Sequence, residues 1–240
     1  MSALLFFSGG IDSAVIATIL AQQPETYGIS STAPIILLAH ASPGERAKKE
    51  KRLAQLARAC FQAQTHRYEL EVVEMPLHEH DQLPIGSEGH SGQPLITKWK
   101  PDRDSCPYTS GLHMALAALA VNRLAFLPRP TSGFRTAFWG FQEDNLAWEA
   151  QDAGKLPKND ASEAWVKSLN GLMGQSPTKT RFRAPFLESR LSKYQIVQLA
   201  QRLGTPLKLT SSCIYGWEGC GRCWQCNRRA NVFRALAISE

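Results

Sequence analysis

The chain has 240 residues and a mass of 26.6 kDa, and 43% of its residues are hydrophobic and 20% charged, as in ordinary globular proteins. The formal charge of +6 and the pI of about 9.1 suit phosphate-bearing small molecules as well as nucleic acid, and because the basic residues are scattered, charge alone gives nucleic-acid binding little support. The longest apolar runs, Pro34–Ala39 and Ala115–Val121, are too short to cross a bilayer, and no basic segment precedes the first apolar run as in a signal peptide, so a cytoplasmic protein is expected.

A buried strand is expected first, over Ala3–Phe7, because an apolar run leads into a polar turn that contains two glycines. The turn is Ser8–Ser13, with the sequence SGGIDS, and the apolar, helix-forming residues Ala14–Leu20 follow it. The stretch therefore predicts a strand, a tight turn and the N-terminus of a helix.

The SGGIDS turn carries the groups that a phosphate site needs. A helix N-terminus after a glycine-rich turn supplies converging N–H donors, and Gly9 and Gly10 let the backbone approach the ligand closely. Ser8 and Ser13 add hydroxyl donors, and Asp12 can hold Mg²⁺ or cap the helix. The lysine of a P-loop and the third glycine of a dinucleotide fingerprint are absent. The turn fits phosphate or pyrophosphate, and the alternative is a plain turn capped by Asp12 or Ser13.

Strands and helices alternate in the next part of the chain. Pro34–His40 is a second predicted strand, Glu45–Phe61 has helical composition, and Tyr68–Val73 is a third predicted strand. The apolar positions of the helix recur at spacings of three and four, at Leu53, Leu56, Ala57 and Cys60. This order implies parallel strands with crossover helices and hence an α/β fold.

The second half of the chain begins with a long irregular segment, Pro76–Pro107, which is rich in glycine, proline and histidine. Segments of this length inside a compact domain are usually functional or disordered. The elements expected after it are a helix over Gly111–Leu124, a strand over Thr136–Gly140, a helix over Ala161–Met173, a short strand over Arg183–Leu187, and an amphipathic helix over Leu191–Leu203 that stops at Gly204.

Four of the six cysteines crowd together near the C-terminus, at Cys213, Cys220, Cys223 and Cys226. Their spacing suits one tetrahedral Zn²⁺, and four cysteine ligands leave no open position for water, so the metal would be structural. The tight turns that such a knuckle needs are supplied by Gly216, Gly219 and Gly221. An iron–sulfur cluster is the competing metal. Cys106, an isolated cysteine, is either a nucleophile or a small buried hydrophobe.

Both ends of the chain resemble one family. SGGIDS directly after an apolar strand resembles the SGGxDS signature of the PP-loop ATP pyrophosphatases, which adenylate an oxygen and release pyrophosphate before a nucleophile displaces AMP. Together with the stretches TSSCIYG, GCGRCWQCNRRA and APFLESRLSKYQIVQLAQRLG, it makes the chain similar to the 7-cyano-7-deazaguanine synthase (QueC) family over most of its length.

The resemblance implies a fold, a set of domains and a set of ligands. The fold is a Rossmann-like parallel sheet with flanking helices, of the PP-loop (HUP) type, in a single domain over residues 1–240, with a zinc-binding subregion over 205–240. ATP and Mg²⁺ would be bound by the signature, with Asp12 and Ser13 catalytic, and Zn²⁺ by the cysteines. The residues for ATP are Ser8, Gly9, Gly10, Ile11, Asp12 and Ser13. His40 either lines the adenine pocket through its backbone or simply ends its strand.

The implied activity is that of an AMP- and pyrophosphate-forming C–N ligase. A 7-deazapurine carboxylate would be adenylated and attacked by ammonia or another amine to give an amide, and a second adenylation would give the nitrile. The partners are then a small deazapurine and ammonia, with no membrane, and a homodimer is one possible assembly. Residues expected near the substrate are Lys98, Arg103, Gly140, Glu143, Asp144 and Arg190.

The sequence departs from the family pattern in the segments that would bind the substrate. Ser105–His113 stands in place of a Val-Pro-Gly-Arg-Asn segment, and FQEDNLAW replaces a loop rich in Glu, Thr and Asp. A second hypothesis is therefore a QueC-like ligase of an antiphage defence system that joins a deazapurine to a protein or nucleic acid. A third is a nucleotide-binding or zinc-stabilised scaffold without turnover, against which the intact SGGIDS set argues.

Overall fold

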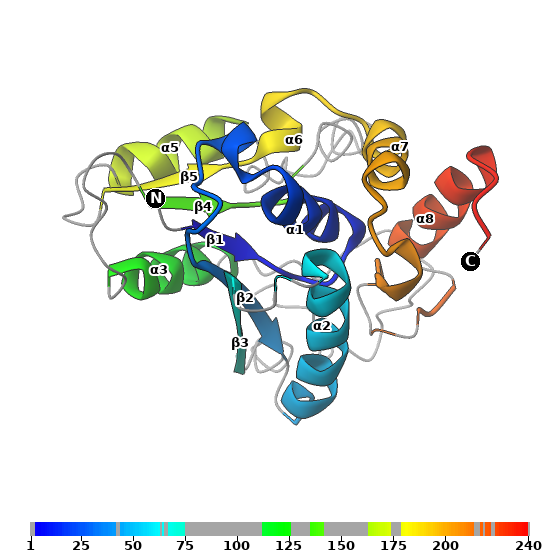
Figure 1. Cartoon of the computed structure of the whole chain (residues 1–240), viewed down its shortest axis with the longest axis horizontal. Helices are drawn as coiled ribbons and strands as arrows, with labels where there is room; N and C mark the ends of the chain where they lie inside the picture. The colour runs from blue at the N-terminus through cyan, green and yellow to red at the C-terminus, as the bar shows by residue number, and fades with distance from the viewer. Residues whose placement is uncertain are drawn as a thin grey trace, which may run out of the picture.

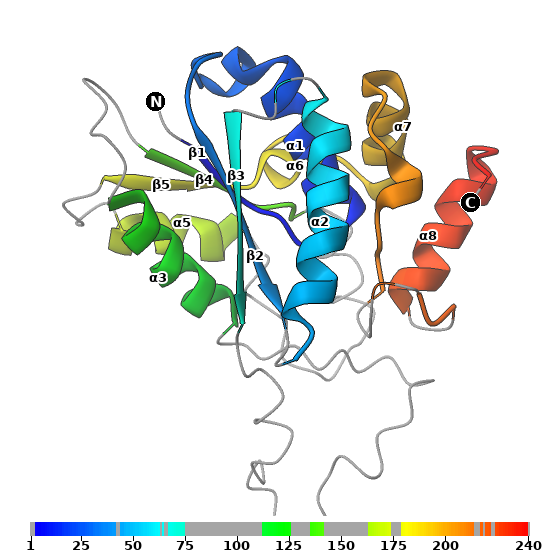
Figure 2. The ribbon, with the colours of Figure 1, turned by 60° about the horizontal axis from the view of Figure 1, so that its bottom comes forward.

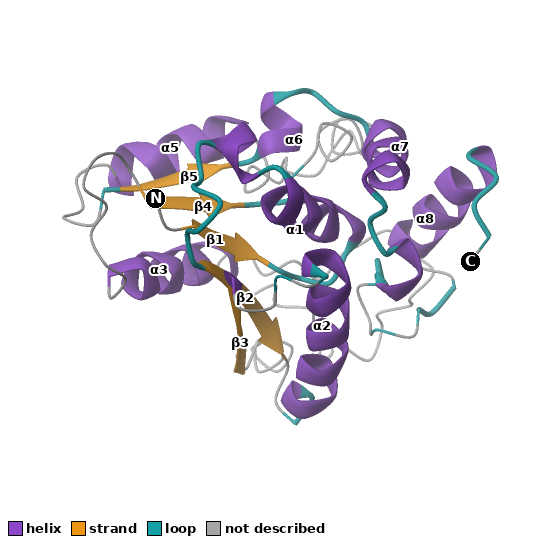
Figure 3. Cartoon of the chain, viewed as in Figure 1, coloured by secondary structure: helices purple, strands orange, loops and turns teal. Residues whose placement is uncertain are grey.

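A five-stranded parallel sheet forms the centre of the molecule, in the order β3-β2-β1-β4-β5 (Figures 1 and 3). The computed structural model describes residues 3–41, 44–62, 64, 67–74, 112–125, 135–141, 163–173, 179–213, 217, 219–221 and 224–239, and the structural statements below concern these. The strands are β1 (Ala3–Phe6), β2 (Ile35–Ala41), β3 (Tyr68–Glu74), β4 (Arg135–Phe138) and β5 (Thr180–Arg183), and each neighbouring pair is parallel.

Helices cover both faces of the sheet (Figure 2). On one face lie α1 (Ile11–Gln22), α2 (Arg46–Phe61) and α7 (Lys193–Leu203), and on the other lie α3 (Leu112–Ala125) and α5 (Glu163–Met173). The remaining helical segments are short or peripheral: η1 (Pro24–Tyr27), α6 (Pro185–Glu188), η6 (Leu207–Leu209) and α8 (Trp224–Ala235), which lies beside α7.

The central strand β1 explains why the sheet needs helices on both sides. Leu5 and the following Phe7 belong to the apolar cluster under α1, α2 and α7, whereas Leu4 and Phe6 belong to the cluster under α3 and α5. All four side chains are buried. A strand that is buried on both faces reads as a continuous apolar run, which is how this strand is recognised in the sequence.

The strand order creates a point where the chain changes face. The connections from β1 through α1 to β2 and from β2 through α2 to β3 use one face, and α3 and α5, which precede β4 and β5, lie on the other. In open parallel sheets, ligands bind outside the carboxyl ends of the strands at such a switch point. The SGGIDS turn follows the carboxyl end of β1 and therefore lies at this switch point.

The predicted α/β class is confirmed, and one element needs correction. Arg183–Leu187 was expected to be a strand, but β5 ends at Arg183 and Pro185 opens the short helix α6. Proline suits the first helical position because its missing N–H has no intrahelical acceptor there. Glu188 closes the turn, because its Oε1 accepts a hydrogen bond from the Ala184 N–H at 3.1 Å. The apolar residues Phe186 and Leu187, which suggested a strand, are buried from this helical turn.

The last amphipathic helix agrees closely with its prediction. Ser192 caps α7 through a reciprocal capping box with Gln195, and Gly204 ends it in the left-handed conformation with φ of 68°. The irregular segment Pro76–Pro107 lies outside the described residues. Across the part of the chain that the structure describes, no helix combines the length and apolar character needed to cross a bilayer.

Cys60 of α2 supplies a pH-dependent share of stability. The thiol is buried against α1, where its Sγ lies 3.7 Å from the Ala14 carbonyl oxygen, and burial raises its pKa from 9.0 to about 11. The unfolded chain loses this proton first, so the stabilisation is complete below pH 9 and is lost as the pH rises through 11. We expect the stability difference between the wild type and Cys60→Ala to be about 2 kcal/mol larger at pH 8 than at pH 10.5. Urea unfolding at both pH values measures it, and an unchanged difference contradicts the assignment.

Candidate functional site

The SGGIDS turn connects the carboxyl end of β1 to the N-terminus of α1. Gly9 is buried with φ of +88°, a conformation that glycine adopts without strain, and Gly10 is the N-cap of α1. No side chain of the described residues caps this helix, so the alternative of a plain turn capped by Asp12 or Ser13 does not fit the structure. The amides of Ile11, Asp12 and Ser13 donate to no acceptor among the described residues, which leaves them available to a ligand.

The two serines of the turn lie next to each other. The Oγ atoms of Ser8 and Ser13 are 3.3 Å apart, and the Ser13 hydroxyl donates to the carbonyl oxygen of Gly10 at 3.0 Å. The Gly10 amide in turn points at Ser8 Oγ, 3.3 Å away. The hydroxyls therefore brace the turn from inside and stand beside the helix N-terminus.

Lys193, a residue that sequence reasoning missed, completes the site. It is the first residue of α7, its side chain is only 4% exposed, and its Nζ donates to both carboxylate oxygens of Asp12, at 2.7 and 2.8 Å. Burial lowers the pKa of Lys193, and the charge of Asp12 opposes this, while Arg228 and Arg229 of α8 lower it further. Because the Asp12 carboxylate compensates the charge of Lys193, Arg228 and Arg229 supply the excess positive charge near the pair, which favours an anionic ligand.

A signal for Lys193 was present in the helical periodicity. The buried positions of α7 are Lys193, Ile196, Val197 and Ala200, so the lysine occupies the inward face of an amphipathic helix. Lysine on a buried face almost always has a charged partner. The periodicity indicates a buried cation, but only the fold identifies its partner, because Asp12 lies 181 residues away in the sequence.

Gly140 was predicted near the substrate, and it lies directly against the turn. It follows β4, which neighbours β1 in the sheet. A Cβ atom at Gly140 would stand 2.8 Å from Asp12 Cβ and 3.3 Å from the Ser13 backbone nitrogen. The absence of a side chain at this position therefore keeps the N-terminus of α1 uncovered.

The other predicted site residues have different positions. His40 is half-buried near the end of β2, the strand beside β1, whereas Arg190 is exposed in the turn after α6 with φ of 51°. The described contacts of the SGGIDS turn do not include Arg190. The remaining predicted residues lie outside the described part of the chain: Lys98, Arg103, Glu143, Asp144 and the metal ligand Cys223.

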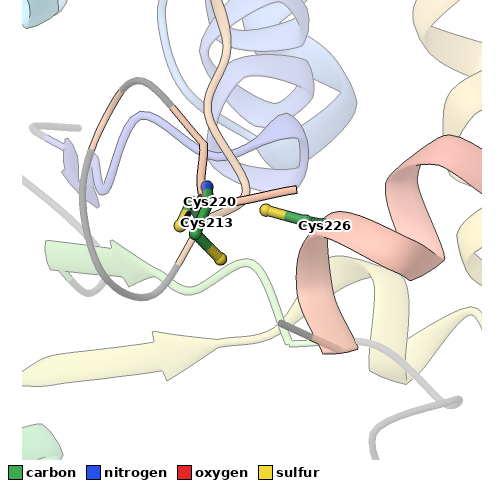
Figure 4. A group of neighbouring side chains, drawn as sticks. All are labelled: Cys213, Cys220 and Cys226. Carbon is green, nitrogen blue, oxygen red and sulfur yellow. Dashed lines mark hydrogen bonds between the residues drawn. The ribbon is translucent and has the colours of Figure 1, made fainter. Parts of the chain in front are cut away.

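Three of the four predicted metal ligands come together near the C-terminus (Figure 4). The Sγ atoms of Cys213, Cys220 and Cys226 all lie within 4.8 Å of one another. Cys213 and Cys220 belong to the segment before α8, and Cys226 extends towards them from the first turn of that helix. The Cys220 amide lies 3.3 Å from Cys213 Sγ, an N–H···S contact that stabilises a thiolate.

The cluster fits a tetrahedral metal ion. Around Zn²⁺ with Zn–S distances of about 2.3 Å, the sulfur atoms of a tetrahedron stand about 3.8 Å apart, within the separation found here. Gly219 and Gly221 flank Cys220 with φ of 77° and 67°, as expected for tight turns, whereas Gly216 lies outside the described residues. The described residues thus form a candidate metal centre with three thiolates.

Loss of one cluster cysteine should remove the metal. We expect Cys226→Ser to lower the bound metal from about one equivalent to less than one tenth and to lower the melting temperature. Elemental analysis of purified protein measures both the amount and the element, and so separates zinc from iron. Cys60→Ala is the matched control, because Cys60 is buried in α2 away from the cluster. Full metal content in Cys226→Ser would exclude this ligand set.

Comparisons with known proteins confirm the family resemblance. A family model described as "Queuosine biosynthesis protein QueC" matches residues 139–237. The 7-cyano-7-deazaguanine synthase of Methanobrevibacter smithii is 25% identical over 242 residues, which cover 99% of this chain and 95% of that protein. The corresponding protein of Methanothermobacter thermautotrophicus is 24% identical, with 100% and 97% covered. In Sulfurisphaera tokodaii, a 7-cyano-7-deazaguanine synthase 2 is 24% identical, but the match covers only 46% of that protein.

Two solved structures are similar over the whole chain at low scores. The U34-tRNA thiolase NcsA from Methanococcus maripaludis, with its [4Fe-4S] cluster, has a TM-score of 0.47 and 16% identity, covering 98% of this chain and 67% of that chain. An NMN synthetase from Francisella tularensis has a TM-score of 0.46 and 13% identity, covering 100% and 78%. Likeness at this level indicates neither the substrate nor the metal of the present chain.

Proposed function

We propose that this relative of the 7-cyano-7-deazaguanine synthases is an ATP-dependent C–N ligase that adenylates a 7-deazapurine carboxylate and lets ammonia displace AMP. The observation that carries the proposal is the SGGIDS turn at the carboxyl end of β1, with three amides that have no acceptor among the described residues and the buried Lys193 beside it. The similarity to synthases over nearly the whole chain supports the deazapurine as substrate.

The turn would bind the β- and γ-phosphates of ATP. Backbone amides at a helix N-terminus favour bound phosphate, and the cations of Lys193, Arg228 and Arg229 add to the attraction. Mg²⁺ arrives with the phosphates, and the carboxylate of Asp12 and the hydroxyl of Ser13 are oxygen ligands of the kind it prefers. The role of these groups is to stabilise the charge that develops on pyrophosphate as it leaves.

The bond changes follow from the poor reactivity of a carboxylate. Its oxygen attacks the α-phosphorus of ATP, the bond to pyrophosphate breaks, and the carbon gains AMP as a leaving group. Ammonia attacks that carbon, and AMP departs with loss of one proton to leave an amide. In a second round the amide oxygen attacks the α-phosphorus of another ATP and a second pyrophosphate leaves. Loss of AMP and of the two protons on nitrogen then gives the nitrile. Two ATP are consumed for one nitrile.

The cysteine cluster would hold a structural Zn²⁺. Cys223, together with Cys213, Cys220 and Cys226, completes four thiolate ligands, which leaves no position for water or substrate. The metal then stabilises the fold of residues 205–240 against the rest of a single α/β domain, and takes no part in the chemistry.

One incubation tests the proposal. The protein is mixed with ATP, Mg²⁺, 7-carboxy-7-deazaguanine and ammonium, and AMP, ADP, pyrophosphate and product mass are followed. We expect AMP and pyrophosphate in equal amounts and a product with the mass of the amide or the nitrile. Release of ADP, or of no nucleotide product at all, would contradict an adenylating enzyme.

A second candidate keeps the activation and changes the acceptor. The sequence at Ser105–His113 and after β4 departs from the family pattern in the region expected to read the substrate, which favours a different nucleophile. In that case the adenylated deazapurine would be transferred to an amine of a protein or nucleic acid, as in a QueC-like ligase of an antiphage defence system. A mass increase on a macromolecule, in place of a free amide or nitrile, distinguishes the two.

A further inference from the structure

We propose that Trp217 is a positioning residue for the SGGIDS turn, through which the metal centre sets the shape of the nucleotide site. The inference rests on the proposed function, because it concerns the turn that would bind the phosphates of ATP. Trp217 belongs to the segment between Cys213 and Cys220, and its indole ring is half-buried against the apolar cluster under α1, α2 and α7.

The ring of Trp217 lies directly on Gly9. A Cβ atom built on Gly9 would stand 2.4 Å from both Cη2 and Cζ3 of the indole, and 2.9 Å from Cδ2 of Leu53. Gly9 is thus held between a side chain of α2 and a side chain of the metal-binding segment. Both neighbours fill the space in which a Cβ would stand, so they support the turn from both sides at the residue with φ of +88°.

Hydrogen bonds tie residues 207–211, directly before the cysteine segment, to the turn and to α8. The Ser211 amide donates to the Gly9 carbonyl oxygen at 2.9 Å, two residues before the first cluster cysteine. From α8, Arg229 donates to Thr210 Oγ1 at 2.7 Å and to the Leu207 carbonyl oxygen at 3.0 Å. Ser211, before the first cluster cysteine, therefore contacts the turn directly, and Arg229, after the last one, contacts residues 207–210 just before Ser211.

The cysteines determine where the indole stands. Trp217 lies between Cys213 and Cys220, whose sulfur atoms are within 4.8 Å of each other and of Cys226 on α8. A metal ion bound to these sulfurs would hold the cysteines on either side of Trp217 in sequence together, and so keep the indole on Gly9. Without metal we expect this contact to weaken and the amides of the turn to be less well ordered before ATP binds.

Calorimetric binding of Mg·ATP to the full-length protein tests this inference. We expect Trp217→Ala to weaken binding by about tenfold, since loss of positioning at a phosphate site costs at least that much, and Trp217→Phe to restore most of it. Tyr68→Ala is the matched control, because Tyr68 is a half-buried aromatic residue at the start of the edge strand β3, where it packs on Phe61 at the end of the sheet opposite the SGGIDS turn. Its melting temperature should fall, but its ATP affinity should be unchanged.

Metal removal gives the second arm. Chelation of the cysteine-bound metal, followed by removal of the chelator and addition of excess Mg²⁺, should weaken Mg·ATP binding of the wild type by a similar factor. It should weaken binding by Trp217→Ala little further, because both changes release the same contact. In the steady state the loss should appear in KM for ATP more than in kcat. Equal ATP affinity in wild type and Trp217→Ala overturns the inference alone, as does additive loss on chelation. A wild type that binds no ATP overturns the proposed function as well.

Discussion

Replacing Lys193 with methionine is expected to lower ATP-dependent turnover by about 100-fold, the loss typical for removal of one preorganised charge from an active site. Methionine keeps the apolar stem of the side chain, but it removes the ammonium that pairs with Asp12 at 2.7 Å, and the Asp12 side chain is only 20% exposed. The free energy of unfolding should therefore fall by about 2–4 kcal/mol. Initial rates of AMP formation and urea unfolding measure the two effects.

A double substitution separates activity from stability. Asp12→Asn combined with Lys193→Met removes both charges, so part of the lost stability should return while turnover stays low. Lys167→Met on α5 is the matched control, because this lysine is exposed, and both rate and stability should match the wild type. If Lys193→Met turned over ATP at the normal rate, the buried pair would be structural only.

Gly140→Ala is expected to weaken Mg·ATP binding by at least about tenfold. The new methyl group would stand 2.8 Å from Asp12 Cβ and 3.3 Å from the Ser13 nitrogen, distances at which the backbone of the turn must shift. The N-terminal amides of α1 would be displaced and partly covered at once. Isothermal titration calorimetry with Mg·ATP gives the affinity, and circular dichroism confirms that the variant is folded.

Gly171→Ala provides the matched control for this substitution. Gly171 lies in α5 with nothing within 4 Å of a Cβ atom, so alanine there should raise stability by about 0.5–1 kcal/mol and leave ATP binding unchanged. Were Gly140→Ala to bind ATP as tightly as Gly171→Ala, the turn would not be the phosphate site.

The SGGIDS turn and the cysteine cluster were predictable from local sequence patterns. The apolar run before SGGIDS identifies β1, and the spacing of the cysteines identifies their cluster, because in both cases the relevant residues are close in the chain. The parallel pairing of the strands also follows from the alternation of strands and helices, but their order in the sheet does not. The strand prediction at Arg183–Leu187 was wrong, because a short apolar run suits a strand or a helical turn equally. Pro185 begins a helical turn there.

Contacts between distant segments were beyond the reach of the sequence. Nothing near Lys193 indicates Asp12, and nothing near Gly9 indicates that Trp217 covers it, since each contact depends on how α7 and the metal-binding segment lie against β1 and α1. The position of Gly140 over Asp12 follows from the pairing of β4 with β1, which no local pattern specifies.

The pairing of Lys193 with Asp12 across 181 residues has a consequence for synthesis on the ribosome. The residues of SGGIDS leave the exit tunnel well before their partner, which is 181 residues further along the chain. The neighbouring bond from Gln22 Nε2 to the Leu203 carbonyl oxygen spans the same interval. A nascent chain therefore holds Asp12 without its Lys193 partner until α7 has been translated, and the proposed phosphate site is completed only when α7 docks.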